Sequence, residues 1–412
     1  MSDGVLFVHN NFPGQFRDLA QALVARGVTC WAIGQHHAPG LAEVRLARYG
    51  LSRGSTPGIL PAAVRAEADL LRAADAFRAA RALRENGCDP AVIVAHPGWG
   101  ETLYLAEVFP DARQVLFAEF FYHGRGLDVG FDPEFPAPDD TEIQRVNAKG
   151  LAMAYAYAHA DAIVTPTPFQ ASTLPPVFRE RARIVHEGVD VAGIRPIWEA
   201  GPLEPFALPD GRVLSPGTPV VTHVNRSLEP ARGIHTFARA LPRLLAEVPD
   251  AHALVIGEAK PSGYGGSAPD GGTWKDWAFG GLQIDPARVH FLGKLPHERM
   301  HAAMRLGAAH VYYTVPFVLS WSLSEAMALG CHVVGSDTAP VRDAIEDGVS
   351  GRLLPFSDHA ALSQVLIDAC RNPRAADPLR RGARAKAEAM FDRDKGRQAW
   401  FALLREQGLA IP

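Results

Sequence analysis

The sequence is poor in cysteine, in lysine and in long apolar runs. Its four cysteines form no Cys-x-x-Cys pair, which excludes a dense disulfide framework and a thiolate zinc site. Only six of the 41 basic residues are lysines, and the net charge of −4 offers no basic field to nucleic acid. Apolar runs are too short for a membrane span, and none near the start is long enough for a signal peptide. We therefore expect a cytoplasmic protein.

Two common kinds of site are also missing from the sequence. The loop after the first predicted strand contains one glycine, Gly14, and not the Gly-x-Gly-x-x-Gly pattern of a dinucleotide site. The 16 histidines are scattered, and Asp139 and Asp140 lie in a proline-rich segment without partners of metal-binding spacing. We therefore expect neither a bound metal ion nor a cofactor.

What the sequence does contain is an alternation of short apolar runs with longer amphipathic stretches. The runs predict strands at Val5–His9, Val28–Ile33, Ala91–Ala95, Gln114–Ala118, Ala162–Thr165, Ile184–His186, Val220–Val224, Ala253–Ile256, Val289–Leu292, His310–Tyr313 and His332–Gly335. The stretches between them predict helices, among them Ala62–Glu85, Thr141–His159, Ile234–Glu247 and His297–Leu306. Apolar strands alternating with helices are typical of parallel sheets covered on both faces, so we predict an α/β protein with two doubly wound sheets.

The domain boundaries follow from length and from proline and glycine content. A chain of 412 residues is too long for one ordinary core. Prolines and glycines crowd between residues 191 and 217, where the periodicity disappears. We therefore predict a first domain over residues 1–190, a linker over 191–217 and a second domain over 218–388. A helix in the last segment, 389–412, is expected to cross back onto the first domain.

Residues that directly follow strands are the candidates for binding, because open parallel sheets bind ligands beyond the carboxyl ends of their strands. In the second half, Arg226 follows a predicted strand, and Arg232 precedes Gly233 six residues further on. Guanidinium groups donate forked hydrogen bonds and stay charged, so this pair suits a diphosphate. The alternative is that both arginines are solvated surface residues. Gly257, after the next strand, is a further candidate.

The most specific segment is residues 312–337, in which a strand is followed by an irregular loop and a helix. Glu325 falls on an otherwise apolar face of that helix. A buried carboxylate needs hydrogen-bond donors, and two ribose hydroxyls would supply them. The alternative is that Glu325 pairs with an arginine inside the fold.

Several short elements together resemble the family 4 glycosyltransferases. They are the first-strand loop with Gly14, the element Glu187-Gly188-Val189-Asp190, Arg226 with a basic residue before Gly233, Phe291-Leu292-Gly293, and the segment around Glu325-Ala326-Met327. The resemblance covers nearly the whole chain and implies the GT-B fold, in which two Rossmann-like domains face each other across a cleft. It also implies transfer of a sugar from a nucleotide diphosphate with retention of the anomeric configuration.

The resemblance implies roles for individual residues. Arg226 and Arg232 would hold the diphosphate. His96 and Glu119, which directly follow predicted strands, complete the catalytic set, and the alternative for His96 is a purely structural role. The further donor-binding positions are Gly14, Gly257, Lys294, Leu295, Leu319, Ser320, Trp321 and Glu325, the last of which would take the ribose. Residues assigned to the acceptor or sugar side are Pro13, His123 and Glu187.

The chain departs from the family pattern at two places. Many members carry two glutamates separated by seven residues, and the first of these positions is Phe317 here. Members also tend to have a histidine near the position of Glu119, where Glu119 or His123 would have to substitute. In the retaining reaction the leaving diphosphate is thought to accept the acceptor's proton, so Phe317 removes no obligatory base, and an active enzyme is favoured.

The leading hypothesis is a metal-independent hexosyltransferase that moves a hexose from a UDP- or GDP-sugar to a saccharide or lipid-linked acceptor, in polysaccharide or glycoconjugate synthesis. The alternatives are a nucleotide-sugar epimerase of the same shape and a GT-B module that binds a nucleotide sugar without turnover. We expect no nucleic-acid partner. A peripheral contact with the inner face of a membrane stays open, because the predicted helix at Ala62–Glu85 carries five arginines, although the acidic residues among them favour a merely solvated helix.

Overall fold

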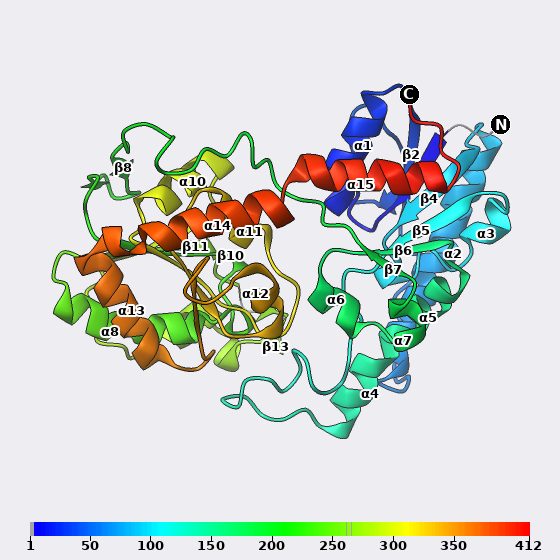
Figure 1. Cartoon of the computed structure of the whole chain (residues 1–412). Helices are drawn as coiled ribbons and strands as arrows, with labels where there is room; N and C mark the ends of the chain where they lie inside the picture. Colours follow the sequence, from blue (N-terminus) through cyan, green and yellow to red (C-terminus); the bar gives the residue numbers. More distant parts are fainter. Residues whose placement is uncertain (1–3, 261, 265) are drawn as a thin grey trace. The chain divides into compact units, whose positions relative to one another are not determined.

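The computed structural model describes residues 4–260, 262–264 and 266–412. It divides into two compact units. Unit 1 comprises the residues up to Glu187 together with Arg393–Pro412, and unit 2 comprises Gly188–Asp392. The last helix, α15 (Arg393–Glu406), therefore belongs to unit 1 although it follows unit 2 in the sequence (Figure 1).

Unit 1 is built on a seven-stranded parallel sheet. Its strands are β1 (Gly4–Val8), β2 (Thr29–Gln35), β3 (Arg45–Tyr49), β4 (Pro90–Ala95), β5 (Arg113–Phe117), β6 (Ala162–Thr165) and β7 (Ala182–Ile184). They follow the order β3-β2-β1-β4-β5-β6-β7, and every neighbouring pair is parallel. The chain runs outward from β1 to β3 and then returns to the other side of β1. The switch point of the strand order therefore lies between β1 and β4.

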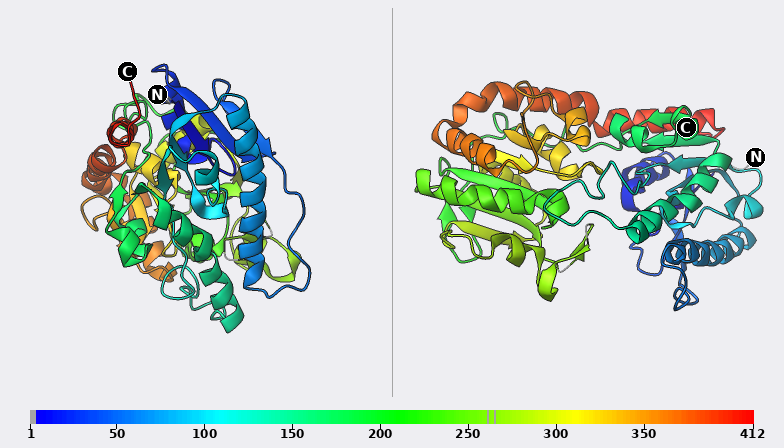
Figure 2. Two further views of the ribbon diagram at one scale, coloured as in Figure 1. Left: turned by 90° about the vertical axis from the view of Figure 1, so that its right-hand side faces the viewer. Right: turned by 90° about the horizontal axis from the view of Figure 1, so that it is seen from below.

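Helices cover both faces of this sheet. They are α1 (Arg17–Val24), α2 (Ala63–Glu85), α3 (Leu105–Val108), α4 (Asp140–Ala148), α5 (Gly150–His159), α6 (Pro168–Thr173), α7 (Pro176–Arg179) and α15. Because side chains alternate along a strand, Val5 and Phe7 of β1 lie in the same apolar cluster as residues of α1 and α15. Leu6 and Val8 lie in a second cluster with residues of α2 and α5. In the right-hand view of Figure 2, α15 and α2 lie on opposite sides of the sheet.

Unit 2 repeats this architecture with six parallel strands. They are β10 (Val220–Ser227), β11 (His252–Glu258), β14 (Val289–Gly293), β15 (Ala309–Tyr312), β16 (Val333–Ser336) and β17 (Arg352–Leu354). Their order is β14-β11-β10-β15-β16-β17, which places the switch point between β10 and β15. The helices are α8 (Ile234–Glu247), α9 (Trp274–Phe279), α10 (His297–Leu306), α11 (Trp321–Ala328), α12 (Ala339–Ala344), α13 (His359–Arg371) and α14 (Asp377–Met390). Two doubly wound parallel α/β sheets are thus observed, which confirms the predicted fold class.

The segment 191–217, expected as a linker, lies within unit 2. Val191, Ile194 and Phe206 are buried in the apolar core that also contains residues of α11 and α14. The segment also forms a two-stranded antiparallel sheet from β8 (Phe206–Ala207) and β9 (Val213–Leu214), and a second such pair, β12 (Ser262–Gly263) with β13 (Gly266–Ser267), follows β11. The proline-rich segment 191–217 is therefore irregular in backbone but packed into the core of unit 2.

The observed elements depart from the predicted ones mainly at the sheet edges. Strands β3 and β17 were not predicted, because each is an edge strand whose sequence is short and partly charged. The helix predicted at Thr141–His159 is two helices, α4 and α5, which meet at Lys149 and Gly150.

Two arginines of the long helix α2, which was considered as a membrane contact, form ion pairs within the helix. In the described part of the chain, no helix is both long and apolar enough to cross a bilayer. Arg65 and Arg72 of α2 both pair with the buried Asp69, at 2.8 and 3.3 Å. These two guanidinium groups are therefore engaged within the helix.

Three buried histidines make the stability of unit 2 depend on pH. Burial lowers the pKa of His223 to about 4. Burial together with the neighbouring His223 lowers the pKa of His310 to about 3, and burial together with the charge of Arg380 lowers that of His332 to about 4. Between about pH 4 and 6.5 the unfolded chain therefore binds protons that the folded chain does not, and stability falls as the pH falls below 6.5. From pH 7.5 to 6.0 we expect a loss of roughly 1 kcal/mol or less for each histidine.

The measurement is urea unfolding of the chain at pH 7.5 and 6.0. His310→Gln should lower the dependence on pH, because one of the three groups is then absent. His359→Ala is the matched control, since His359 is exposed at the start of α13. An unfolding midpoint that does not change between the two pH values would contradict the expectation.

Candidate functional site

In unit 2, the residues that follow β10 and β15 meet at the switch point. Arg232, in the loop between β10 and α8, is buried, and its Nη1 donates to Thr314 Oγ1 and to the carbonyl oxygen of Val318, each at 2.9 Å. These contacts join the loop after β10 to the loop after β15. Gly233 makes the turn into α8 with φ of 67°, and a Cβ there would lie 2.4 Å from Tyr313 Cβ, so only glycine fits.

Arg226 is the last but one residue of β10 and, unlike Arg232, is exposed. Its Nη2 donates to the hydroxyl of Tyr264 at 2.9 Å, and its guanidinium carbon lies 5.5 Å from the centre of the same ring. The guanidinium carbon of Arg232 lies 5.8 Å from that ring. Both cations therefore gather around Tyr264.

Phe317 stands where many relatives have the first glutamate, and the structure shows what it packs against. Its buried ring lies 4.9 Å from the ring of Tyr264 and 5.7 Å from the guanidinium carbon of Arg232. A carboxylate near the arginines is supplied instead by Glu229, which is buried and accepts a hydrogen bond from the Tyr264 amide. Burial raises the pKa of Glu229, against the opposing effects of that amide and of the two arginines.

Helix α11 lies against the same end of β10. The hydroxyl of Ser322, in its first turn, lies 3.3 Å from the carbonyl oxygen of Val224, two residues before Arg226. Glu325 lies three residues after Ser322, on the same side of the helix. The helix that carries Glu325 therefore begins at the end of the sheet where Arg226 lies.

Among the described residues, the ion pairs of Glu325 are with two histidines and not with an arginine, which was the alternative expected from the sequence. Its Oε1 lies 3.2 Å from His297 Nδ1, and its Oε2 lies 3.3 Å from His301 Nε2. Both histidines belong to α10 and were not among the predicted site residues. The signal that could have found them is the sequence His297-Glu298-Arg299-Met300-His301, whose two histidines, four residues apart, lie on one face of a helix.

The other residues predicted to bind the donor lie at or after strand ends or begin α11 in unit 2, and they differ in exposure and in contacts. Lys294 is exposed and Leu295 half-buried just after β14, and Leu319 packs on the apolar core. The amide of Ser320 donates to the hydroxyl of Tyr312 at 2.8 Å. Trp321 begins α11 and is 47% exposed. Gly257 has a structural reason of its own, because a Cβ there would lie 2.3 Å from the carbonyl oxygen of Asn225.

In unit 1, three residues that follow β1, β4 and β5 form one hydrogen-bonded group. Glu119 Oε2 lies 3.4 Å from His96 Nε2, and Glu119 Oε1 accepts from Gln15 Nε2 at 2.6 Å. Gln15 Oε1 lies 2.7 Å from His9 Nε2, and the rings of His9 and His96 are 5.5 Å apart. The structure thus brings together His96 and Glu119 and adds Gln15 and His9, the latter having been predicted as the last residue of the first strand.

The charge states within this group are set by burial and by the neighbouring side chains. Burial, together with the neighbouring His96, lowers the pKa of His9 to about 3, so His9 is neutral near pH 7. Burial by itself raises the pKa of Glu119, but the hydrogen bond and charge of His96 and the hydrogen bond from Gln15 outweigh it, and the net shift is downward. Glu119 is therefore an ionised acceptor next to two imidazoles.

The remaining predicted residues of unit 1 are less closely gathered. Gly14, directly after Pro13, has φ of 45°, and a Cβ there would lie 2.5 Å from the His9 ring, so glycine is required at this turn. Glu187 lines a small hollow with Gln15 and Arg397. His123 Nε2 lies 2.7 Å from the carbonyl oxygen of Thr173, a contact with its own domain framework and not with Glu119.

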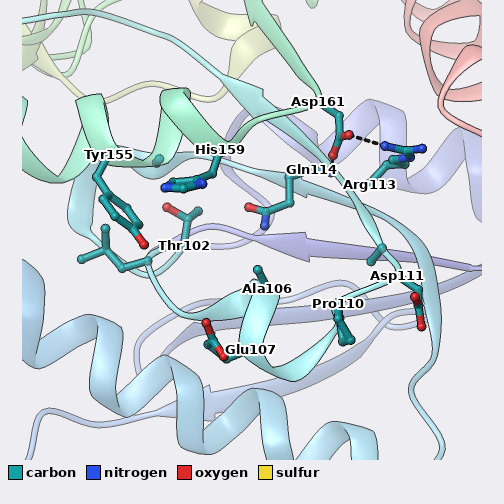
Figure 3. Close-up of a pocket in the computed structure, with 13 residues that line it drawn as sticks. Thr102, Ala106, Glu107, Pro110, Asp111, Arg113, Gln114, Tyr155, His159 and Asp161 are labelled. Carbon is teal, nitrogen blue, oxygen red and sulfur yellow. Dashed lines mark hydrogen bonds and ion pairs between the residues drawn. The ribbon is translucent and has the colours of Figure 1, made fainter.

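A larger hollow of about 500 Å³ lies in unit 1 at the opposite edge of the sheet (Figure 3). Its lining includes Arg113 and Gln114, which begin β5, and Asp161, which directly precedes β6. Arg113 pairs with Asp161 at 2.7 Å, so its charge is compensated. Because doubly wound sheets bind ligands beyond the carboxyl ends of strands, this amino-end hollow is not the candidate site.

Comparison with known families decides the relationship of the chain. The model of the glycosyl transferase family 4 group matches residues 26–194, and the model of glycosyl transferases group 1 matches residues 218–372. The chain belongs to the family 4 glycosyltransferases. This confirms the resemblance drawn from the sequence.

Curated relatives of this family 4 chain match about half of it. The phosphatidyl-myo-inositol mannosyltransferase of Mycolicibacterium smegmatis is 30% identical over 215 residues, which cover 51% of this chain and 47% of the relative. The glycogen synthase of Mycobacterium tuberculosis is 28% identical over 218 residues, 51% of this chain and 44% of the relative. The chain thus spans about half the length of the curated relatives it matches.

Solved structures of similar fold cover nearly the whole family 4 chain. The sucrose-phosphate synthase of Thermosynechococcus elongatus superposes with a TM-score of 0.69 at 18% identity and covers 98% of both chains. The Anabaena protein HepE in complex with UDP and glucose gives a TM-score of 0.62 at 16% identity, over 98% of this chain and all of that one. At these identities the likeness shows the fold, which is GT-B.

Proposed function

We propose that the chain is a retaining hexosyltransferase that takes a hexose from a UDP- or GDP-sugar and passes it to a hydroxyl of a saccharide or lipid-linked acceptor. The observations that support this proposal are the fixed position of Arg232 at the switch point of the unit 2 sheet, with Arg226 beside the same tyrosine, and the start of the helix of Glu325 against the end of β10. Two cations, with a buried carboxylate on that helix, suit the two charged or polar parts of a nucleoside diphosphate, namely the pyrophosphate and the ribose diol.

The chemistry asks little of a protein base. The bond between the anomeric carbon and the diphosphate oxygen breaks, and the acceptor oxygen bonds to the same face of that carbon. The acceptor's proton passes to the departing diphosphate. The main requirement is stabilisation of the negative charge that develops on this diphosphate, which Arg232, fixed by Thr314 and Val318, and Arg226 would provide. This reaction uses the nucleotide sugar as substrate and needs neither metal nor cofactor.

The unit 1 group is proposed to bind the sugar. The ionised Glu119, held by Gln15 and His96, would accept hydrogen bonds from hexose hydroxyls, and the neutral His9 ring and the His96 ring would contact the sugar. Phe317 removes a carboxylate from the unit 2 side, so selection among sugars would depend more on Glu119 and Glu229.

The proposed acceptor is a saccharide or a lipid-linked molecule. One matched relative is named for a mannosyl transfer to phosphatidyl-myo-inositol and another for glycogen synthesis, so both lipid-linked and saccharide acceptors have precedent among the relatives. A cytoplasmic enzyme with a peripheral contact at the inner face of a membrane is consistent with the first. The paired arginines of α2 argue against that helix as the contact.

A thermal-shift screen with UDP, GDP and ADP, alone and as sugar conjugates, tests the donor. A ligand that binds the folded state raises its stability by mass action, by about 2.7 kcal/mol at a concentration 100 times the Kd. We expect either UDP or GDP to raise Tm more than ADP does. Mass spectrometry should then detect the released nucleoside diphosphate together with a glycosylated acceptor. An epimerised nucleotide sugar, or binding without turnover on a broad acceptor panel, would contradict the proposed activity.

A further inference from the structure

Helix α10 presents two imidazoles on one face. His297 is its first residue and His301 follows one turn later, so both side chains point from the same side of the helix. Their rings lie 6.0 Å apart and perpendicular to each other. Together with Glu298 they spell the His-Glu-x-x-His spacing, in which two histidines four residues apart bind zinc from one helix.

Glu325 of α11 completes a set of three ligand atoms. Among the described residues, one nitrogen of each histidine and a carboxylate oxygen of Glu325 all lie within 4.8 Å of one another. The Glu325 and His301 side chains are 9% and 14% exposed, whereas that of His297 is 75% exposed. The group is therefore closed on its inner side and open on its outer side, which leaves room for a further ligand such as water.

The distances within the group are compatible with coordination of one ion. The nitrogen–oxygen separations are 3.2 and 3.3 Å. Charge-assisted hydrogen bonds are shorter, about 2.7–2.9 Å. The edge of a tetrahedron around Zn²⁺ with bonds of about 2.0–2.1 Å is about 3.3 Å long. His297 Nδ1 and Glu325 Oε1, and likewise His301 Nε2 and Glu325 Oε2, are therefore separated by about the distance between two ligand atoms of one Zn²⁺ ion.

We propose that His297, His301 and Glu325 form a binding site for a divalent transition metal ion, with Zn²⁺ the best fit. Two imidazoles and one carboxylate are a common zinc ligand set, and the open outer side supplies the fourth position. This revises the expectation that the chain holds no metal-binding cluster, because the third ligand comes from another helix and no local spacing reveals it.

The site has a consequence that rests on the proposed function. Glu325 is also the residue assigned to the donor ribose, and one carboxylate does not serve a metal ion and a ribose diol at the same time. Zn²⁺ therefore competes with the nucleotide sugar and inhibits transfer, which itself uses no metal. The chain would be active when free zinc is low and inactive when free zinc is high.

Metal binding is tested directly, without any nucleotide. The full chain is treated with a chelator, dialysed and titrated with ZnCl₂ by calorimetry, and with Co²⁺ while visible absorption of tetrahedral cobalt is recorded. We expect one Zn²⁺ per chain, and at least about 100-fold weaker binding in His301→Ala and in Glu325→Ala, since loss of an outer partner alone costs 10–100-fold. His359→Ala is the matched control and should bind as the wild type does. Absence of one-to-one binding, or binding that survives both ligand substitutions, would overturn the site.

The competition is tested with the nucleoside diphosphate that gives the largest thermal shift. We expect its apparent Kd to rise at least tenfold at saturating Zn²⁺ in the wild type, and to change less than twofold in His301→Ala. If the metal-free chain binds no nucleotide, the proposed function is wrong while the metal site stands or falls by the titration alone. If nucleotide and Zn²⁺ bind together without mutual effect, the competitive role of the site is wrong.

Discussion

Glu325→Ala is expected to abolish binding of the donor nucleotide at concentrations that saturate the wild type. The carboxylate is buried on α11, whose first turn contacts β10 through Ser322, and in the proposed site its loss removes the acceptor for two ribose hydroxyls. Hydrogen bonds to charged groups contribute about 1.5–3 kcal/mol each, so the affinity should fall by roughly 100-fold or more. Glu325→Gln keeps one acceptor oxygen, so its affinity for the nucleotide should lie between those of the wild type and Glu325→Ala. Isothermal titration with the selected nucleoside diphosphate measures the effect.

A ligand lacking the ribose hydroxyls makes this test specific. The 2′,3′-dideoxy analogue should bind the wild type and Glu325→Ala with similar, weak affinity, because the group that the substitution removes has no partner on that ligand. Glu199→Gln is the control, since Glu199 is an exposed glutamate of the same unit. Equal losses for the ribose and dideoxy ligands would instead show that the substitution acts through the fold.

Arg232→Gln is expected to remove most of the affinity for the diphosphate while sparing that for the nucleoside. The guanidinium is buried and held by Thr314 and Val318, so it is positioned before any ligand arrives. Loss of a forked, charged donor should cost about 3 kcal/mol, or roughly 100-fold in affinity. Arg232→Lys keeps the charge without the fork and should recover only part of the loss. Affinities for the nucleoside, monophosphate and diphosphate, measured for each variant, give the result.

Arg226 and Arg243 provide the comparisons for this experiment. Arg226→Gln should weaken diphosphate binding with little change in Tm, because Arg226 is exposed, whereas Arg232→Gln should also lower Tm. Arg243 is an exposed arginine of α8 that pairs with Glu247, and Arg243→Gln should change neither quantity appreciably. An undiminished affinity for the diphosphate in both Arg226→Gln and Arg232→Gln would remove these arginines from the site.

The fold was largely predictable because its signal is local. Central strands such as β4 and β6 are continuous apolar runs, and helices such as α8 and α10 were predicted with their observed bounds. Edge strands β3 and β17 were not, since one side of each faces no neighbouring strand and their residues are mixed in character. The segment 191–217 was expected as a linker because irregular backbone leaves no periodic signal, even where it is packed into a core.

The sequence by itself determined the α/β class, the family and the positions that follow each strand, where Arg226, Arg232, His96 and Glu119 were predicted. These conclusions depend on residues close together in the chain. Only the tertiary structure decided that Arg232 is buried and Arg226 exposed, that Gln15 and His9 join Glu119, and that His297 and His301 face Glu325. The physical reason is that such contacts join side chains from different elements, whose approach is set by strand order and helix packing and has no periodicity along the chain.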